Sequence, residues 1–269
     1  MSGHARIPAE APVLKRCCAR LYESEAARWL LGETFHPGGL ALTDRLGVML
    51  GLGAGDQVLD VASGRGASAI FLAERFGCEV VGIDYSAASA EAANAEAAAR
   101  GLSDRVRFQR GDAESLPFRD RAFRALICEC AFCTFPDKVQ AAREFARVLD
   151  AGGRIGLTDL TRAAELGGQL QSLLAWIACI ADAKPVEEYL NYLQEAGFSM
   201  KPVEPHAEAL RELVQQVRTR LLAAEILQGL GRIDAPELDV GAARTLAKAA
   251  TQAIERGELG YVLMTGARI

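Results

Sequence analysis

Residues 57–66 have the types and spacing of a nucleotide-binding loop. The apolar run at residues 57–61 (QVLDV) is typical of a buried parallel strand, and the next five residues, ASGRG, are small enough for the backbone to approach a ligand closely. Residues 67–76 have helical apolar spacing and are followed by Gly77, so the free N–H groups that begin this helix would face the ligand. The segment therefore predicts the first half of a nucleotide-type site.

Acidic residues follow two further predicted strands. Asp84 ends a strand at residues 79–83, about twenty residues after the small-residue loop, which suits a carboxylate that binds a ribose. A carboxylate accepts hydrogen bonds from two vicinal hydroxyls at once, and Tyr85 beside it could lie against an adenine face. A third strand at residues 106–109 leads to Gly111-Asp112-Ala113-Glu114, where an acid could accept from the adenine amino group. These residues complete a predicted nucleoside site.

This order of strand, small-residue loop, helix, strand and acid resembles the class I S-adenosylmethionine-dependent methyltransferases. Their first loop pairs an acid at the strand end with a Gly-x-Gly sequence, which Asp60 and residues 64–66 match. The resemblance implies S-adenosylmethionine as cofactor, with Glu129 in contact with its methionine part. The cofactor-binding residues implied are Asp60, Ala62, Ser63, Gly64, Gly66, Asp84, Tyr85, Asp112, Ala113, Glu114 and Glu129. A doubly wound domain that binds another nucleoside is the alternative.

Strands and helices alternate along the chain. Further strands are predicted at residues 125–129, 154–158, 198–203 and 260–267, and further helices at 13–31, 41–50, 87–100, 137–149, 163–183, 186–196, 207–230 and 240–256. This order predicts an α/β fold with a doubly wound, mostly parallel seven-stranded sheet of the Rossmann-like type and helical lid insertions. We expect an N-terminal helical cover or edge layer at residues 1–50, the S-adenosylmethionine-binding core at 51–160, and a helical lid with the C-terminal strands of the same domain at 161–269.

The composition favours a small-molecule substrate and a reducing compartment. Of the 269 residues, 50% are hydrophobic and 24% are charged, which is ordinary for a soluble globular protein. The net charge of −5 and the scattered arginines offer no basic surface for a nucleic acid. Residues 1–15 lack an apolar core of signal-peptide length, and the longest apolar stretch, residues 173–181, is too short to cross a bilayer. With seven cysteines, an odd number, we expect reduced thiols, a cytoplasmic location and no membrane partner.

Three segments that carry cysteines resemble the arsenite methyltransferases. Residues 130–138, CAFCTFPDK, match the loop in which that family has an arsenic-binding cysteine shortly before Pro-Asp-Lys. The residues around Cys179 match the segment of its second core cysteine, and Cys17-Cys18 match a paired-cysteine segment more loosely. The resemblance implies that Cys130 and Cys179 are catalytic residues that bind arsenite as substrate, with a reducing thiol as a further partner. For a third thiol, either Cys17 or Cys18 takes the place of the family's glycine-loop cysteine, or two protein thiols suffice.

The residue types leave three kinds of function open. Trivalent arsenic prefers thiolate ligands, and its lone pair could attack the donor's methyl group without a general base. However, Gly38 and Gly39 occupy the glycine-rich loop where many arsenite methyltransferases have another cysteine. An organic acceptor that reacts through oxygen or nitrogen would require a base, for which the candidates are His36, Glu129, Asp159 and His206. A metalloid sensor, or a structural zinc site at Cys128, Cys130 and Cys133, would be a binding module instead.

Overall fold

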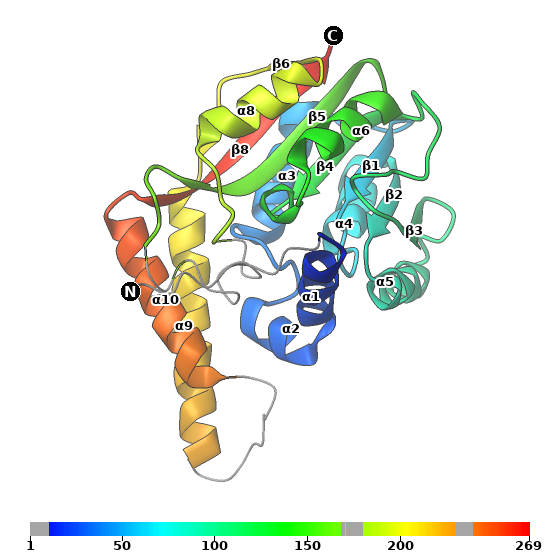
Figure 1. The fold of residues 1–269 in the computed structure, drawn as a ribbon. Helices are drawn as coiled ribbons and strands as arrows, with labels where there is room; N and C mark the ends of the chain where they lie inside the picture. The colour runs from blue at the N-terminus through cyan, green and yellow to red at the C-terminus, as the bar shows by residue number, and fades with distance from the viewer. Residues whose placement is uncertain (1–10, 168–169, 171–179, 230–238) are drawn as a thin grey trace.

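A single mixed sheet forms the centre of the protein. The computed structural model describes residues 11–167, 170, 180–229 and 239–269. The sheet order is β3-β2-β1-β4-β5-β8-β6 (Figure 1). The short strand β7 also pairs with β8. Strand β8 is antiparallel to its neighbours and the other pairs are parallel, so the predicted doubly wound Rossmann-like fold is confirmed. The strands are β1 Gln57–Val61, β2 Glu79–Asp84, β3 Val106–Arg110, β4 Phe123–Glu129, β5 Leu149–Arg162, β6 Phe198–Met200, β7 Glu204–Pro205 and β8 Leu259–Arg268.

The described sheet has eight strands rather than the seven predicted. The strand predicted at residues 198–203 is shortened to β6 (residues 198–200), and an additional two-residue strand, β7, follows at residues 204–205. Both strands pair with β8, but at separate places: β6 pairs with residues 266–268, and β7 pairs with residues 262–263. The eighth strand therefore arises because the ladder with β8 breaks after β6 and resumes at β7, which apolar alternation in the sequence does not reveal.

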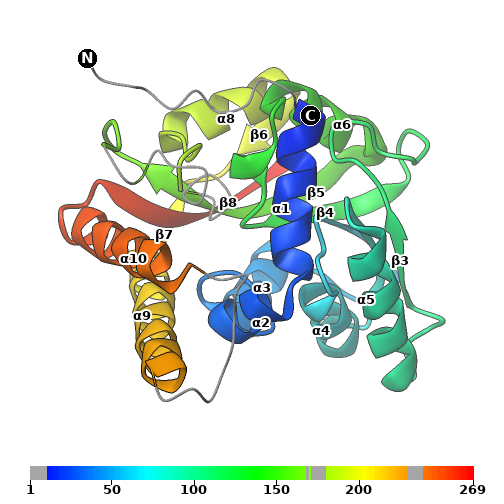
Figure 2. The same ribbon diagram turned by 60° about the horizontal axis from the view of Figure 1, so that its bottom comes forward.

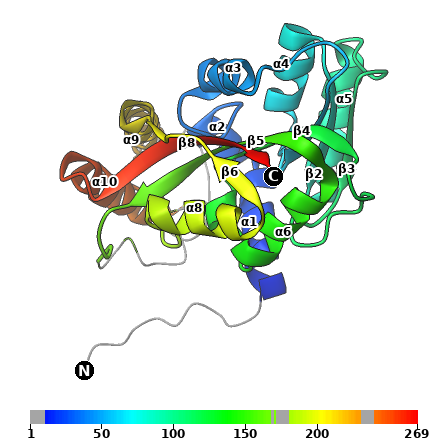
Figure 3. The same ribbon diagram turned by 90° about the horizontal axis from the view of Figure 1, so that it is seen from above.

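Helices cover both faces of the sheet. Figure 3 shows α3 and α4 on one face and α6 and α8 on the other, as a doubly wound fold requires. Each of these helices buries one apolar side against the strands. The helices are α1 Ala11–Glu23, α2 Glu25–Leu31, α3 Gly39–Leu50, α4 Ala67–Phe76, α5 Ala87–Ala99, the 3-10 helix η1 Phe132–Thr134, α6 Lys138–Val148, α8 Val186–Glu195, α9 Ala207–Gly229 and α10 Val240–Glu255.

Two predicted helices differ from the structure. Ser24 divides the helix predicted at residues 13–31 into α1 and α2, because its hydroxyl accepts the Ala27 N–H (3.1 Å) and begins a new helix. Residues 163–167 and 180–183, the described ends of the helix predicted at 163–183, are not helical. The Ala163 N–H donates to the Glu258 carbonyl (2.9 Å), so the start of this segment pairs with the chain before β8 instead of forming a helical turn.

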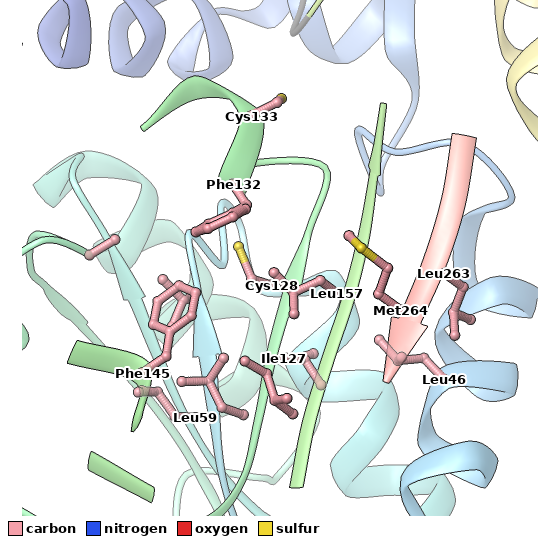
Figure 4. Close-up of a cluster of buried hydrophobic side chains, with 14 of the residues drawn as sticks. Leu46, Leu59, Ile127, Cys128, Phe132, Cys133, Phe145, Leu157, Leu263 and Met264 are labelled. Carbon is pink, nitrogen blue, oxygen red and sulfur yellow. The ribbon is translucent and has the colours of Figure 1, made fainter. Parts of the chain in front are cut away.

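Apolar side chains on both faces of the sheet form the main core. Leu59, Ile127 and Leu157 come from neighbouring parallel strands and are fully buried (Figure 4). Leu46 of α3 and Phe145 of α6, also fully buried, belong to the same cluster. Near-continuous burial along β1 and β4 is typical of parallel strands that are covered on both faces. The core thereby fixes the strand ends from which the site is built.

Helices α9 and α10 form a separate pair beside β8. They pack on each other through a second cluster of buried residues, and they extend away from the sheet (Figure 1). Arg220 of α9 donates to the Leu30 carbonyl of α2 (2.8 Å), which joins this pair to the N-terminal helices. None of the described helices combines the length and apolar character that a membrane span requires.

Candidate active site

A pocket lies where the carboxyl ends of the parallel strands meet the N-terminal helices. Its walls come from the loop after β1, the end of β2, the loops after β3 and β4, helix α1 and residues 33–36. Figure 2 shows α1 in front of strands β4 and β5. Ligands of open α/β sheets bind at this edge, so the pocket occupies the expected position for a nucleoside site. None of its described wall residues belongs to α9 or α10, which lie in the predicted lid.

The loop after β1 is held by its own backbone and by β2. The Ser63 N–H donates to the Ile83 carbonyl (2.9 Å), and the Gly64 N–H donates to Asp84 Oδ2 (2.9 Å). Ala62, Ser63 and Gly64 line the pocket, whereas Gly66, a predicted cofactor ligand, does not. A Cβ at Gly66 would lie 2.4 Å from Phe108 Cζ, so the structure assigns this glycine to packing beneath the loop.

Asp60 places a buried carboxylate in the pocket wall. Its side chain is 2% exposed, and Oδ2 accepts no hydrogen bond from any described group. Burial, with the neighbouring charges of Glu129 and Asp84, raises the pKa of Asp60 well above its usual range. A buried acceptor without a donor costs free energy. We therefore expect this oxygen to accept a hydrogen bond from a ligand, most effectively from a cation.

Asp84 presents its carboxylate to the pocket in a fixed orientation. Oδ1 accepts the Ser86 N–H (2.8 Å) and Oδ2 accepts the Gly64 N–H (2.9 Å). Burial raises the pKa of Asp84, although these two hydrogen bonds oppose the shift. Each oxygen keeps a second lone pair, which suits two vicinal hydroxyls. Tyr85 also lines the pocket, and the Arg110 guanidinium lies 5.8 Å from its ring centre.

The loop after β3 is tied to α1 by a lysine that the sequence did not single out. Asp112 and Ala113 line the pocket, and Glu114 lies behind them, outside the pocket lining. The Lys15 ammonium donates to both Asp112 oxygens (2.8 Å each) and to Glu114 Oε2 (2.5 Å). The local sequence around Lys15 does not predict this contact, because the partners of Lys15 lie in a distant segment.

A buried polar cluster stands at the end of β4. Thr43 donates to both oxygens of Glu129 (3.2 and 3.1 Å), and His36 Nε2 lies 3.6 Å from Glu129 Oε2. Ser68 Oγ lies 3.4 Å from the same imidazole nitrogen. With a proton on Nδ1, His36 donates to the Pro37 carbonyl (3.2 Å), and Nε2 of the neutral ring is then an acceptor. His36, Ser68 and Glu129 line the pocket.

The other two candidate bases lie elsewhere. Asp159 is fully buried within β5, where its oxygens accept the Cys133 N–H (2.8 Å) and the Leu160 N–H (2.7 Å). His206 pairs with Glu204 (2.9 Å) before α9. Neither residue lines the pocket, so the structure leaves His36 and Glu129 as the candidates there.

Two of the four predicted catalytic cysteines line the pocket. These are Cys18 on α1 and Cys130 at the end of β4. Cys17 is outside the pocket lining, because successive residues of a helix point in different directions, and Cys179 lies outside the described residues. Within the described chain no cluster of three His, Cys, Asp or Glu residues could hold a metal ion, so the zinc hypothesis finds no support. Figure 4 shows Cys128 among core side chains and Cys133 on the other side of Phe132.

Backbone strain is concentrated at the pocket. In the described chain four residues other than glycine have a positive φ, and three of them line the pocket: Phe35 (57°), Ala62 (59°) and Cys130 (53°). The Cys130 N–H donates to the Thr158 carbonyl (2.7 Å), which holds it beside β5 in this conformation. Such strained residues gather at functional sites, since the surrounding structure must maintain them.

Comparison with known proteins identifies the class of enzyme. The family described as "Methyltransferase domain" matches residues 58–153. The 27-O-demethylrifamycin SV methyltransferase of Amycolatopsis mediterranei is 32% identical over 227 residues, which cover 83% of this chain and 81% of that protein. The chain belongs to the S-adenosylmethionine-dependent methyltransferases. An arsenite methyltransferase of Halobacterium salinarum is 28% identical to this methyltransferase over 158 residues, which cover 58% of the chain and 40% of that protein.

Solved structures share the fold of this methyltransferase. The [4+2]-cyclase SpnF has a TM-score of 0.78 and 24% identity, with 97% of this chain and 98% of that chain covered. The geranyl diphosphate C-methyltransferase of Streptomyces coelicolor A3(2), solved with S-adenosyl-L-homocysteine, has a TM-score of 0.76 and 19% identity, with coverages of 97% and 100%. The predicted enzyme class and cofactor, S-adenosylmethionine, are confirmed by these comparisons together.

The pocket of the methyltransferase fits this donor chemically. S-Adenosylmethionine carries an ammonium group, vicinal ribose hydroxyls and an adenine amino group, all of which donate hydrogen bonds. The pocket offers three acids as acceptors: Asp60, with an oxygen that no described group satisfies, Asp84 and Asp112. The backbone turn at residues 62–64 has small side chains, so the donor could approach its backbone closely. These residues could hold the donor, with Glu129 close to Asp60 at the methionine end.

Proposed function

We propose that this methyltransferase transfers the methyl group to a soft acceptor held by cysteine thiolates, with arsenite as the first candidate. The observation that supports this proposal is the presence of Cys18 and Cys130 in the lining of one pocket. They come from α1 and from the end of β4, and they share this pocket with the three donor acids. The Halobacterium arsenite methyltransferase adds support from sequence likeness.

Three acids hold the donor in this proposal. Asp60 accepts from the methionine ammonium, which relieves the cost of its buried oxygen. Asp84 accepts from the ribose hydroxyls, and its two backbone hydrogen bonds keep it in place for them. Asp112 accepts from the adenine amino group. Held in this way, the donor supplies an electrophilic methyl group on a sulfonium.

The thiolates position the acceptor. Trivalent arsenic is soft and binds sulfur in preference to oxygen, and its coordination displaces the thiol protons of Cys18 and Cys130. Its lone pair then forms the new bond to carbon, while the sulfonium sulfur keeps the electron pair of the bond that breaks. Arsenic becomes pentavalent, and two molecules of a reducing thiol, which are oxidised together to a disulfide, supply the two electrons that return it to the trivalent state. No base is required, and orientation of the two reactants contributes up to about 7–11 kcal/mol.

A second candidate is an organic hydroxyl acceptor, with His36 as the base. Its Nε2 faces Ser68 and Glu129 of the pocket lining and the buried Thr43, while Nδ1 is anchored on the Pro37 carbonyl. A neutral imidazole held in this way can take the proton of a hydroxyl as it is methylated. The Amycolatopsis relative, whose name describes an organic acceptor, matches more of the chain than the arsenite enzyme does.

Serine variants test the first candidate. Arsenite, S-adenosylmethionine and glutathione are incubated with the full chain, and methylated arsenic is measured by chromatography with mass spectrometry. We expect Cys18→Ser and Cys130→Ser each to lose activity more than about tenfold with binding of S-adenosylhomocysteine retained. Cys17→Ser, one residue away on the same helix, should keep its activity. Wild-type turnover in both Cys18→Ser and Cys130→Ser would refute thiolate binding.

The base variant tests the second candidate. His36→Gln keeps a hydrogen-bonding side chain but cannot take the proton at neutral pH. With a hydroxyl acceptor we expect a loss of about 10²–10⁴ in kcat, and no comparable loss with arsenite. Hydroxyl methylation that survives in His36→Gln would exclude His36 as the base, whichever acceptor the wild type prefers.

A further inference from the structure

The Lys15 ammonium joins two carboxylates at the rim of the pocket. Its three N–H donors are directed at Asp112 Oδ1 and Oδ2 (2.8 Å each) and at Glu114 Oε2 (2.5 Å). The Lys15 and Glu114 side chains are each 14% exposed, and that of Asp112 is 34% exposed. The contact is therefore more protected than an ordinary surface ion pair, and the proposed reaction does not use it.

The lysine allows two like charges to lie together. Burial lowers the pKa of Lys15, but the hydrogen bonds and charges of Asp112 and Glu114 outweigh burial and raise it, so the ammonium keeps its proton. Glu114 is also fixed by the Asp137 N–H, which donates to Oε1 (2.8 Å). Without the ammonium, Asp112 would face a fixed carboxylate of the same charge and would turn away from it.

The hydrogen bonds of Asp112 leave one acceptor position open. Oδ1 accepts from Lys15 and from the Glu114 N–H (3.0 Å), whereas Oδ2 accepts from Lys15 alone among the described groups. A carboxylate oxygen has two lone pairs, so Oδ2 can accept one more N–H from a ligand in the pocket. The amino group at position 6 of adenine is such a donor. An oxo group at the same position would bring two acceptors together and be rejected.

We propose that Lys15 is a positioning residue through which α1 orients Asp112, and that the donor site thereby selects a 6-amino purine over a 6-oxo purine. The inference rests on the assignment of Asp112 to the adenine in the proposed function, but it does not depend on the identity of the methyl acceptor. Lys15 acts through Asp112, since its own donors are all occupied. Helix α1 thus takes part in recognition of the purine as well as covering the pocket.

Binding of two nucleosides tests the proposal. S-Adenosylhomocysteine and S-inosylhomocysteine, which differ at position 6 of the purine, are titrated calorimetrically into the full chain. The variants are Lys15→Met, Lys15→Arg and, as a control, Arg16→Met, which removes a charge from the exposed neighbouring position of α1. We expect Lys15→Met to bind S-adenosylhomocysteine about tenfold more weakly, or about 1.4 kcal/mol, and the inosyl compound almost unchanged. Lys15→Arg should restore most of the preference, and Arg16→Met should match the wild type.

A double variant separates the repulsion between Asp112 and Glu114 from the loss of the contact that Lys15 makes from α1. Removing the charge of Glu114 removes the repulsion, so Lys15→Met with Glu114→Gln should regain part of the preference that Lys15→Met alone loses. Equal weakening of both nucleosides by Lys15→Met, or an unchanged preference, would overturn the role of Lys15. A wild type that binds S-adenosylhomocysteine without preferring it would instead refute the assignment of Asp112 to the adenine.

Discussion

Replacing Gly66 with alanine tests whether packing requires this glycine. At its φ of +84°, the added Cβ would lie 2.4 Å from Phe108 Cζ, 2.9 Å from Phe108 Cε1 and 3.0 Å from Ala93 Cβ. The left-handed backbone costs a residue with a Cβ about 1–2 kcal/mol, and overpacking a filled core costs about 1–3 kcal/mol. We therefore expect Gly66→Ala to lower the free energy of unfolding by about 2–5 kcal/mol. Urea unfolding followed by circular dichroism measures this change.

Gly55 provides the matched control for the backbone contribution. Its φ is +87°, and no heavy atom beyond Gly55 and its two chain neighbours lies within 4 Å of the position of an added Cβ. Gly55→Ala should therefore cost only the backbone contribution of about 1–2 kcal/mol. Replacing the Phe108 ring by the smaller leucine side chain in the Gly66→Ala variant should recover part of the unfolding free energy that the steric clash costs. Equal losses in Gly55→Ala and Gly66→Ala, with no recovery from Phe108→Leu, would refute the packing explanation.

Other predictions follow from charge and burial. Asp60→Asn removes a charge that burial disfavours, so it should raise the free energy of unfolding of the ligand-free protein by about 1–3 kcal/mol at neutral pH, measured by urea unfolding. The same variant should bind S-adenosylhomocysteine at least about tenfold more weakly. Because the pKa of Asp60 is raised in the folded protein, its ionisation lowers the free energy of unfolding as pH rises above about 4. The extra stability of Asp60→Asn over the wild type should therefore vanish in acid, and a difference in unfolding free energy that stays constant across pH would contradict this explanation. The ammonium of S-adenosylhomocysteine favours the ionised form of Asp60. Calorimetry should therefore show tighter binding of S-adenosylhomocysteine as the pH rises above about 4. Burial raises the pKa of Cys78 to about 11, so peptide mapping after iodoacetamide treatment at pH 8 should find Cys78 unmodified in the native protein. The Glu25 side chain is 77% exposed in its pair with Arg65, so Glu25→Gln should change the free energy of unfolding by less than about 0.5 kcal/mol.

The elements that form the pocket wall after β1 and β2 could be predicted because they are local in the sequence. The strand, loop and helix at residues 57–76 follow one another without interruption, and α4 begins and ends where its apolar spacing predicts. Gly66 and Gly77 both adopt left-handed backbone at the ends of this helix, which is a property of glycine that the sequence displays directly. Asp84 is likewise placed at the pocket by the length of a single strand–helix–strand unit.

The remaining features depend on contacts between distant segments. Lys15 meets Asp112 only because α1 lies over the strand ends, and no pattern within α1 carries that information. The strained backbone of Cys130 depends on its hydrogen bond to Thr158 of the neighbouring strand. A helix is predicted from residue 163 onward, but the Arg162 N–H donates to the Lys184 carbonyl and the Ala163 N–H donates to the Glu258 carbonyl, before β8. Tertiary pairing overrides helical propensity at this point.

The position of β8 has a consequence for how the molecule assembles. This strand comes after β6 and β7 in the chain, yet it lies between β5 and β6 and pairs with all three. The strands from β3 to β5 can join through successive crossovers, whereas β6 and β7 have no place in the sheet until β8 arrives. Until that moment the outer edge of β5 exposes unsatisfied peptide groups and is open to mispairing with other chains. Any partly folded form in which β8 has not yet paired therefore offers an open strand edge to other chains, which favours aggregation.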